Sequence, residues 1–289
     1  MESLILRIIY NMADEYSASD IQILKGLEAV RKRPGMYVGD TDDGTGLLQM
    51  LWEVFSNSLD QFLAGKCSSI SVIIHSDNMI EVIDDGGGIR VDDIDGKSFL
   101  ETVMTELHTT ATFDDHAPHT HVGSILGLGV AVVNALSSKV EINTYRDGYH
   151  WSQLYSNSKP SNLNQLEKSD KVGTSFKFIP NESMFSNLDY DQREIRRRLN
   201  ELSSLNPGLV LRFEDHRTIK IEMCSENGIV DLLSNINNNY GDKYSQIISG
   251  SAEYQGMSVG VAFRWQQYGN ELRSFANQLC TLDGGTHDQ

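Results

Sequence analysis

The sequence predicts an α+β fold, because helical and strand-like patterns alternate along most of its 289 residues. Residues 46–64 carry apolar side chains at every third or fourth position, which predicts a long amphipathic helix. Residues 70–74 and 80–83 are rich in Ile and Val and flank a short polar turn, which predicts a β-hairpin. At about 150 residues per domain, the length predicts one large domain and part of a second.

The remaining elements follow from the same patterns. A helix is predicted over residues 20–32, and Pro34-Gly35 is the signal that stops it. Further helices are predicted at 98–108, 129–137 and 189–203. Further strands are predicted at 139–145, 149–155, 172–178, 209–213, 257–265 and 271–279. Polar composition predicts loops at 109–129 and 157–171, and the Asn-rich run 235–239 predicts a domain boundary.

Composition limits the classes of function. Lys and Arg total 24 and Asp and Glu total 40, so the formal net charge is −16. This balance argues against a free-standing module that coats DNA or a membrane, because such modules carry a basic surface. No apolar run is long enough to span a bilayer, and we expect a cytoplasmic protein. The three cysteines form no CxxC pattern, which argues against a disulfide framework or structural zinc site.

The two ends of the sequence carry separate expectations. Residues 3–10 are apolar but too short to span a bilayer, and acidic residues follow them. Met12 opens a run more typical of a soluble protein, so we expect Met12 to be the true start. After Asp283 the chain stops without a closing element, so we expect it to be a truncated piece of a longer protein.

Three polar features are candidates for chemistry. Glu53, Asn57 and Asp60 are spaced by four and three residues, so they share one face of the predicted 46–64 helix. That face is either the edge of a pocket or a solvated stripe. The run from Asp84 to Ile89 reads Asp-Asp-Gly-Gly-Gly-Ile and directly follows a predicted strand, where glycines allow close backbone approach to a ligand. It is either a binding loop or an ordinary turn.

The third feature is a glycine-rich stretch that leads into the predicted 129–137 helix. Gly123, Gly127 and Gly129 precede the apolar start of that helix, and backbone N–H groups at a helix N-terminus form an anion site. It is not a Walker P-loop, because no Lys-Ser/Thr pair follows the glycines.

Taken in this order, the features resemble those of the Bergerat-fold (GHKL) ATPases, and more closely those of bacterial type II topoisomerase B subunits. The resemblance covers about residues 16–289, and the loop at 39–46 looks more like the gyrase branch than the topoisomerase IV branch. The runs that carry the resemblance are 24–39 (with Lys-Arg-Pro-Gly-Met-Tyr), Trp52-Glu53-Val54 with Asn57, 130–137, Gly173-Thr174 and 283–287 (Asp-Gly-Gly-Thr-His).

The resemblance implies a two-layer α/β sandwich, with a mixed sheet and helices on one face, followed by the start of an α/β transducer domain. It divides the chain into an N-terminal extension at 1–15, an ATPase domain at 16–240 and part of the transducer at 241–289. It assigns activation of the attacking water to Glu53, Mg²⁺ to Asn57 and the adenine amine of ATP to Asp84. Further nucleotide contacts fall on Gly88, Ile89, Thr174, Gly127, Leu128, Gly129 and, through an arm from the other protomer, Tyr16. Arg146 matches a residue at the pocket mouth that aminocoumarin inhibitors use.

The chain also departs from that family. Thr110-Ala111-Thr112 stands where the family has Gly-Gly-Lys, so a phosphate-binding lysine is missing. Ser124 and Leu126 replace a glycine and a histidine, Gly87 replaces an arginine and Arg90 a proline. His116, His119 and His121 lie in the same region. They are part of a solvated lid or a partial cationic substitute for the missing lysine; their spacing suggests a metal site, but the carboxylate or Cys geometry of such a site does not accompany it. The four arginines within 193–198 are either a salt-bridged surface or a DNA contact.

Two functions follow from these residues. The first is an ATP-hydrolysing region that closes a homodimer clamp, works with a gyrase A-type subunit and couples ATP to DNA strand passage. Hydrolysis by this chain alone is expected to be weak, because the family's transducer lysine falls beyond residue 289. The second is a divergent module with impaired ATPase activity, which acts through nucleotide or inhibitor binding and dimerisation.

Overall fold

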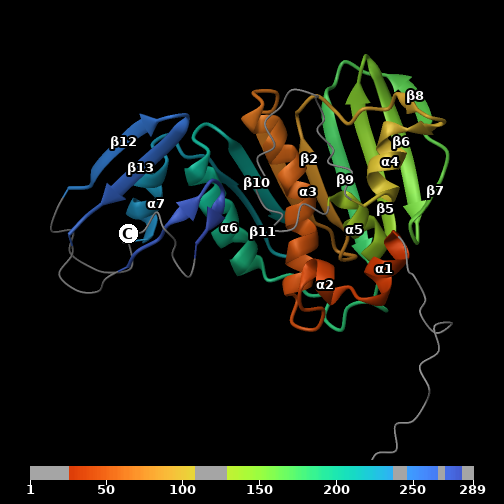
Figure 1. The fold of residues 1–289 in the computed structure, drawn as a ribbon, viewed down its shortest axis with the longest axis horizontal. Coiled ribbons are helices and arrows are strands. Elements are labelled where there is room, and N and C mark those ends of the chain that lie inside the picture. Colours follow the sequence, from red (N-terminus) through yellow and green to blue (C-terminus); the bar gives the residue numbers. More distant parts are fainter. Residues whose placement is uncertain (1–25, 108–128, 237–245, 266–270, 282–289) are drawn as a thin grey trace, which may run out of the picture.

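The computed structural model describes residues 26–107, 129–236, 246–265 and 271–281, which build a nine-stranded mixed sheet with helices packed on one face (Figure 1). The helices are α1 (Leu27–Lys32), α2 (Gly35–Val38), α3 (Thr45–Leu63), α4 (Phe99–Thr105), α5 (Val130–Leu136), α6 (Gln192–Leu205) and α7 (Ile229–Ile236). The predicted α+β class and the two-layer arrangement are confirmed.

The large sheet has the strand order β11-β10-β1-β2-β9-β5-β6-β7, and β8 pairs with β6. Its strands are β1 (Ser69–Ile74), β2 (Ile80–Asp84), β5 (Ser137–Arg146), β6 (Tyr149–Ser156), β7 (Lys159–Pro160), β8 (Asn164–Lys168), β9 (Gly173–Pro180), β10 (Val210–Asp215) and β11 (Ile219–Met223). The sheet is mixed because β1 and β10 run parallel, whereas β1–β2 and β2–β9 are antiparallel. The register of β2 and β9 sets Asp84 opposite Thr174.

Helix α3 is the central helix of the layer that covers the sheet (Figure 1). Its apolar residues recur with helical spacing, and Leu47, Leu51 and Leu59 are completely buried against the strands. The helix ends at Leu63, and Gly65 follows with a φ of +72°, a conformation that glycine adopts readily. The predicted 46–64 helix is therefore confirmed.

The two faces of the sheet differ in polarity, as the strand sequences require. Alternate residues of β1 and β2, such as Val72 and Val82, point into the core beneath the helices. The opposite face carries ion pairs, among them Lys177 with Glu81 at 3.7 Å and with Glu141 at 3.8 Å. On the helix-covered face, Asp84 at the end of β2 is a buried acid.

Two predicted features are wrong. Residues 157–171 are not a loop but contain β7 and β8, and residues 271–279 are not one strand. Instead, β14 (Phe275–Ala276) and β15 (Leu279–Cys280) form a small hairpin. Every residue of β8 is exposed, so its sequence lacks the apolar alternation by which a strand is recognised.

Several elements were not predicted: α2, β3 (Asp93–Ile94), β4 (Lys97–Ser98), β11, α7 and β12 (Ile248–Tyr254). Strand β12 pairs with β13 (Met257–Phe263), and this hairpin lies at the opposite end of the molecule from β6–β8 (Figure 1). None of the described helices is long and apolar enough to cross a membrane.

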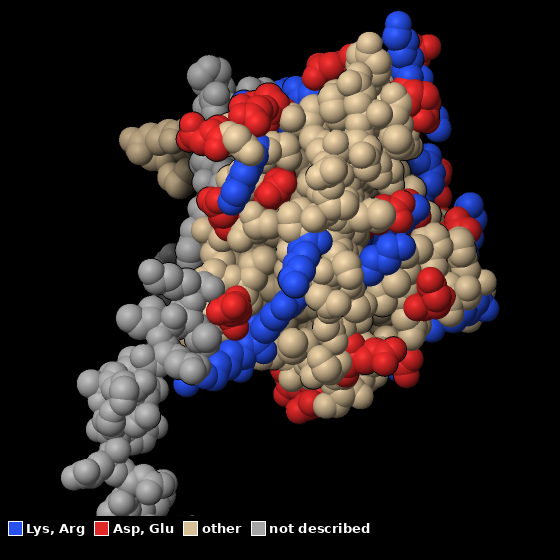
Figure 2. All heavy atoms as spheres, turned by 90° about the vertical axis from the view of Figure 1, so that its right-hand side faces the viewer, with Lys and Arg blue, Asp and Glu red and all other residues tan. Residues whose placement is uncertain are grey.

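On the side that carries β6–β8, basic side chains form one diagonal band and do not cover the face (Figure 2). Figure 2 shows acidic and basic side chains interspersed there around a broad uncharged area. On α6 the arginine-rich run is salt-bridged, because Arg197 pairs with Glu194 and Glu201, and Arg198 also pairs with Glu201. The salt-bridged interpretation of the run is thus supported for Arg197 and Arg198.

Candidate functional site

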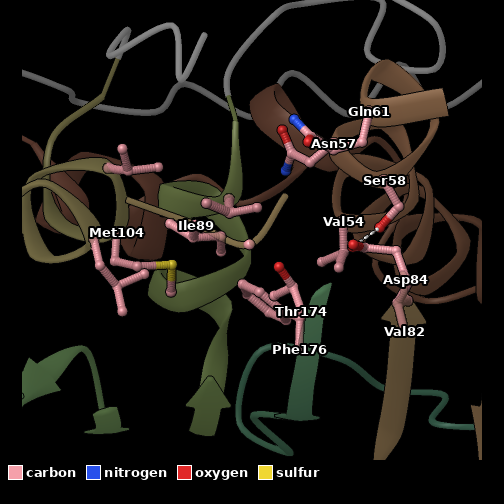
Figure 3. A pocket seen from close by; sticks show the side chains of 14 residues that line it. Val54, Asn57, Ser58, Gln61, Val82, Asp84, Ile89, Met104, Thr174 and Phe176 are labelled. Carbon is pink, nitrogen blue, oxygen red and sulfur yellow. Dashed lines mark hydrogen bonds between the residues drawn. The ribbon is translucent and has the colours of Figure 1, made fainter. Parts of the chain in front are cut away.

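A pocket opens between α3, the ends of β2 and β9, and the helices α4 and α5 (Figure 3). It contains about 470 Å³ of empty space, part of it open to solvent. Its lining consists of Val54, Asn57, Ser58, Gln61, Val82, Asp84, Gly88, Ile89, Leu100, Val103, Met104, Val130, Thr174 and Phe176.

Asp84 is the acidic residue of this lining, placed there as the last residue of β2. It is 9% exposed, and Ser58 Oγ donates a hydrogen bond of 2.7 Å to its Oδ2. The Gly86 N–H donates to Oδ1 at 2.9 Å. Burial raises the pKa of Asp84, and the hydrogen bonds from Ser58 and Gly86, which favour the ionised form, offset only part of this rise. The carboxylate is therefore a buried, pre-positioned hydrogen-bond acceptor.

Two of the three glycines after Asp84, Gly86 and Gly88, are required by close packing. Gly88 has a φ of +73°, and a Cβ there would lie 2.8 Å from both Thr144 Oγ1 and the Tyr145 carbonyl oxygen. Gly87 donates its N–H to Gln61 Oε1 at 3.2 Å. Arg146 lies at the same edge, where its Nη1 donates to the Gly88 carbonyl oxygen at 3.1 Å. The loop is thus fixed from α3 on one side and β5 on the other.

Asp85, next to the pocket acid, anchors this loop to the sheet. Its Oδ1 accepts hydrogen bonds from the N–H groups of Ser68 and Ser69, at 2.7 and 2.9 Å. Burial acts to raise the pKa of Asp85, but the hydrogen bonds from Ser68 and Ser69 outweigh it and hold that pKa well below its usual range. The two adjacent aspartates therefore have different roles: Asp85 is structural and Asp84 faces the pocket.

Glu53 and Asn57 lie one helical turn apart on α3. Asn57 lines the pocket, and its Nδ2 donates to the Glu53 carbonyl oxygen at 3.3 Å. Glu53 is 3% exposed and does not line the pocket itself; its Oε1 accepts a hydrogen bond of 2.9 Å from Gln49 Nε2. Asn57 therefore lies at the edge of the pocket, which is one of the two interpretations of this helix face. The buried carboxylate of Glu53 lies one turn away, outside the lining.

Asp60, the third polar residue of that face, is not part of the pocket lining. Its Oδ1 is fully buried and has no hydrogen-bond partner among the residues that the structure describes. Burial raises the pKa of Asp60 to about 7. This carboxyl group is thus about half protonated near pH 7, and burial alone accounts for the shift.

The structure brings together Asn57, Asp84, Gly88, Ile89 and Thr174 around one pocket, as predicted. Gly129 has a φ of +70° and caps the N-terminus of α5, next to the lining residue Val130. Tyr16, Gly127 and Leu128 lie outside the described residues, as do the altered positions within 108–128. Their predicted contacts therefore stay predictions.

Three residues close to the pocket were not predicted: Gln49, Ser58 and Gln61. Each is polar, at least partly buried, and hydrogen-bonded to Glu53, Asp84 or the N–H of Gly87. Spacing was the available signal, because Gln49 and Gln61 lie four residues before Glu53 and four after Asn57, on the same side of the helix. Ser58 gave no such signal, since a serine in a helix usually bonds to its own backbone.

The pocket combines apolar walls with a few polar groups at one end. Val54, Ile89 and Phe176 supply flat apolar surface, while Asp84 offers a buried acceptor and Asn57 an amide (Figure 3). This arrangement suits a planar, aromatic ligand that carries an N–H donor, with a polar extension toward Asn57. Among the described residues, no group of three or more His, Cys, Asp or Glu side chains is arranged to hold a metal ion.

Comparison with known proteins places the fold and this pocket in a class. Residues 42–183 match the family described as histidine kinase-, DNA gyrase B- and HSP90-like ATPase, and this range includes Asn57, Asp84 and Thr174. The part of the chain that holds the pocket is thus similar to this family of ATPases.

The particular similarity is to DNA gyrase B. Residues 228–289 match the DNA gyrase B family. The chain is 36% identical to the DNA gyrase B subunit of Mycobacterium tuberculosis (strain ATCC 25177 / H37Ra), over 96% of this chain and 46% of that protein. It is 35% identical to the corresponding protein of Mycolicibacterium smegmatis and 36% identical to that of Haloferax volcanii. The chain thus spans less than half the length of these relatives.

Proposed function

We propose that this chain binds ATP in the pocket beneath α3 and hydrolyses it, as the ATPase region of a type II DNA topoisomerase B subunit of the gyrase type. The observation that carries the proposal is Asp84: a buried acceptor at the end of an apolar pocket, beside a loop in which only glycine fits at position 88. The likeness to DNA gyrase B subunits supports the same assignment.

Adenine recognition is assigned to Asp84 and its neighbours. An ionised carboxylate only accepts hydrogen bonds, so it matches the exocyclic amine of adenine. Thr174 is set opposite Asp84 by the strand register, and its side chain joins the lining beside the carboxylate. Ile89 and Phe176 would cover the faces of the ring. Gly127, Leu128 and Gly129 would offer backbone N–H groups to the phosphates at the start of α5.

Hydrolysis is assigned to Glu53. A carboxylate orients an attacking water and accepts its proton, and Gln49 holds one oxygen of Glu53 in place. Asn57 fits a Mg²⁺ site, because its Nδ2 is used within the helix and its amide oxygen is a ligand of the type that Mg²⁺ prefers. When bound, Mg²⁺ would neutralise negative charge on the phosphates of ATP.

The whole protein's activity is proposed from its relatives. Binding of ATP would close two protomers into a clamp, with Tyr16 reaching the partner's nucleotide, and a gyrase A-type subunit would complete the DNA-passing enzyme in the cytoplasm. Arg146, which contacts the Gly88 carbonyl at the pocket edge, would meet aminocoumarin-type inhibitors. The likeness to DNA gyrase B proteins supports the assembly, and the position of Arg146 supports the inhibitor site.

Calorimetric titration with a non-hydrolysable ATP analogue and Mg²⁺ tests the nucleotide site. We expect Asp84→Asn to weaken binding by on the order of a hundredfold, because a hydrogen bond to a charged group is worth about 1.5–3 kcal/mol and the new amide adds a misplaced donor. Glu81→Gln is the matched control, since Glu81 lies on the same strand but on the opposite face. Equal binding by Asp84→Asn and wild type would refute the site.

Turnover separates this proposal from the divergent module with impaired ATPase activity. We expect Glu53→Ala to abolish ATP hydrolysis by the full-length parent protein while leaving analogue binding within about threefold of wild type, because Glu53 lies behind the pocket lining. A full-length wild-type protein that binds the analogue but never hydrolyses ATP would favour the alternative.

A further inference from the structure

Ser58 makes a buried contact that the proposed hydrolysis does not use. It lies on α3, is 4% exposed, and donates its hydroxyl to Asp84 Oδ2 at 2.7 Å (Figure 3). The other oxygen of Asp84 accepts the N–H of Gly86. Both carboxylate oxygens are therefore engaged by donors within the fold before any ligand binds.

We propose that Ser58 is a positioning residue that sets base specificity: its hydroxyl keeps Asp84 a pure acceptor, so the pocket takes 6-aminopurine nucleotides and rejects 6-oxopurine nucleotides. The inference rests on the proposed nucleotide site. A 6-amino group donates to a carboxylate, whereas a 6-oxo group would place a second acceptor against it. A 6-oxo oxygen against the buried carboxylate would find no donor and would be repelled, and sites of this kind discriminate strongly.

The Ser58 hydroxyl opposes the effect of burial on the protonation of Asp84. Burial raises the pKa of Asp84, and the hydrogen bond from Ser58 is the largest effect that lowers it. The neighbouring carboxylate of Asp85 acts in the same direction as burial. Loss of the hydroxyl would therefore shift Asp84 toward its protonated form, which can donate to a 6-oxo oxygen.

Other titratable groups around the pocket acid do not replace Ser58. Cys67, just before β1, stays a neutral thiol, because burial and the adjacent aspartates raise its pKa far above the usual range. Glu53 and Asp60 are the acids of α3 on the neighbouring turns. The groups that lower the pKa of Asp84 by hydrogen bonding are Ser58 and the backbone at Gly86 and Thr174, so the serine hydroxyl is the side-chain group that holds the carboxylate.

Ser56 provides a matched control on the same helix. It is also buried, at 8% exposure, and its hydroxyl donates to the Trp52 carbonyl oxygen at 2.6 Å, within the helix. Ser56→Ala removes the same atom as Ser58→Ala but leaves Asp84 untouched. A general effect of deleting a buried hydroxyl would therefore appear in both variants.

Calorimetric titration with ADP and with IDP at pH 6, 7 and 8 tests the inference. For the wild type and Ser56→Ala we expect the Kd for IDP to exceed that for ADP by at least about a hundredfold. For Ser58→Ala we expect this ratio to fall at least about tenfold, most of all at pH 6, where protonated Asp84 is most populated. Thermal unfolding establishes that each variant is folded.

The outcomes separate the inference from the proposed function. An unchanged ratio in Ser58→Ala at all three pH values, with ADP binding lost in Asp84→Asn, would overturn the role of Ser58 and leave the nucleotide site intact. A wild-type chain that binds neither nucleotide would refute the proposed function and the inference with it. If Ser58→Ala does not fold, Ser58→Cys serves instead, because its weaker donor is expected to lower the ratio in the same direction.

Discussion

At the scale of single residues, the least expected contact is the one between Gln49 and Glu53. Two side chains four residues apart on a helix readily meet, and here the Gln49 amide donates to a carboxylate that is 3% exposed. An amide donor carries no charge and does not titrate near neutral pH. It can hold the carboxylate oxygen in place without competing for the proton that Glu53 is proposed to accept.

Gln49→Met tests this role, because it keeps the length of the side chain but removes the donor. We expect kcat for ATP hydrolysis by the full-length protein to fall by about tenfold, corresponding to roughly 1.4 kcal/mol, with little change in nucleotide Kd. Gln49→His is the companion variant, and its titrating ring is expected to add an inflection near about pH 6.5 to the kcat profile. Loss of nucleotide binding in Gln49→Met would instead indicate a structural role.

Asp60 predicts a pH dependence of stability. Its pKa is raised from 3.8 to about 7 in the fold, so ionisation opposes folding. The free energy of unfolding is expected to fall as pH rises from about 4 to about 7 and to level off above that. Asp60→Asn should remove this slope and stabilise the protein at pH 8 by at most about 4 kcal/mol. Urea unfolding of both proteins at pH 5, 6, 7 and 8 measures the free energy of unfolding. The same dependence on pH in the wild type and in Asp60→Asn would contradict the prediction.

At the scale of elements, the loop after β2 depends on one glycine more than on the others. We expect Gly88→Ala to destabilise the protein by about 2–4 kcal/mol and to weaken ADP binding, because the new Cβ meets Thr144 and the Tyr145 carbonyl oxygen. Gly96→Ala is the control: Gly96 also has a positive φ but nothing lies within 4 Å of its Cβ position. It is expected to cost only about 1–2 kcal/mol, and equal losses in urea unfolding would rule out the steric explanation.

Elements with strong periodicity were predictable and the others were not. Helix α3 and the β1–β2 hairpin follow from their apolar patterns, because each buries one side in the core. Strand β8 is exposed along its whole length, and β14–β15 is too short to show a period. Of the pocket, Asn57, Asp84 and Gly88 followed from motif order. Ser58 did not, because its contact with Asp84 depends on how α3 lies across the sheet.

At the scale of the whole molecule, a charge cluster around the buried carboxylate of Glu201 links α6 to Arg273 and the small β14–β15 hairpin. Glu201 is 1% exposed and pairs with Arg197 and Arg198 on its own helix and with Arg273 at 3.4 Å. Arg198 also donates to the Gln278 carbonyl oxygen at 2.6 Å. The Glu201 carboxylate thus connects α6 of the large sheet domain to Arg273, which lies 72 positions later in the sequence.

Glu201→Gln is expected to lower the free energy of unfolding by about 3 kcal/mol, because it leaves the largely buried guanidinium of Arg198 without its counter-charge. Protease cleavage within 271–281 is expected to become faster in the same variant. The control is Glu222→Gln, which breaks the exposed pair with Arg212 and should cost at most about 1 kcal/mol. Similar losses for the two variants in urea unfolding would argue against a special role of the cluster.

The pairing of β2 with β9 also has a consequence for how the protein folds while it is being synthesised. Glu81 and Ser175, which bond across these two strands, are 94 residues apart. At roughly 5–20 residues per second, the ribosome needs about 5–20 s to add that length of chain. During this interval the β2 edge of the β1–β2 hairpin has no neighbouring strand. Chaperones therefore have time to bind the nascent hairpin, and the floor of the pocket is complete only when β9 leaves the exit tunnel.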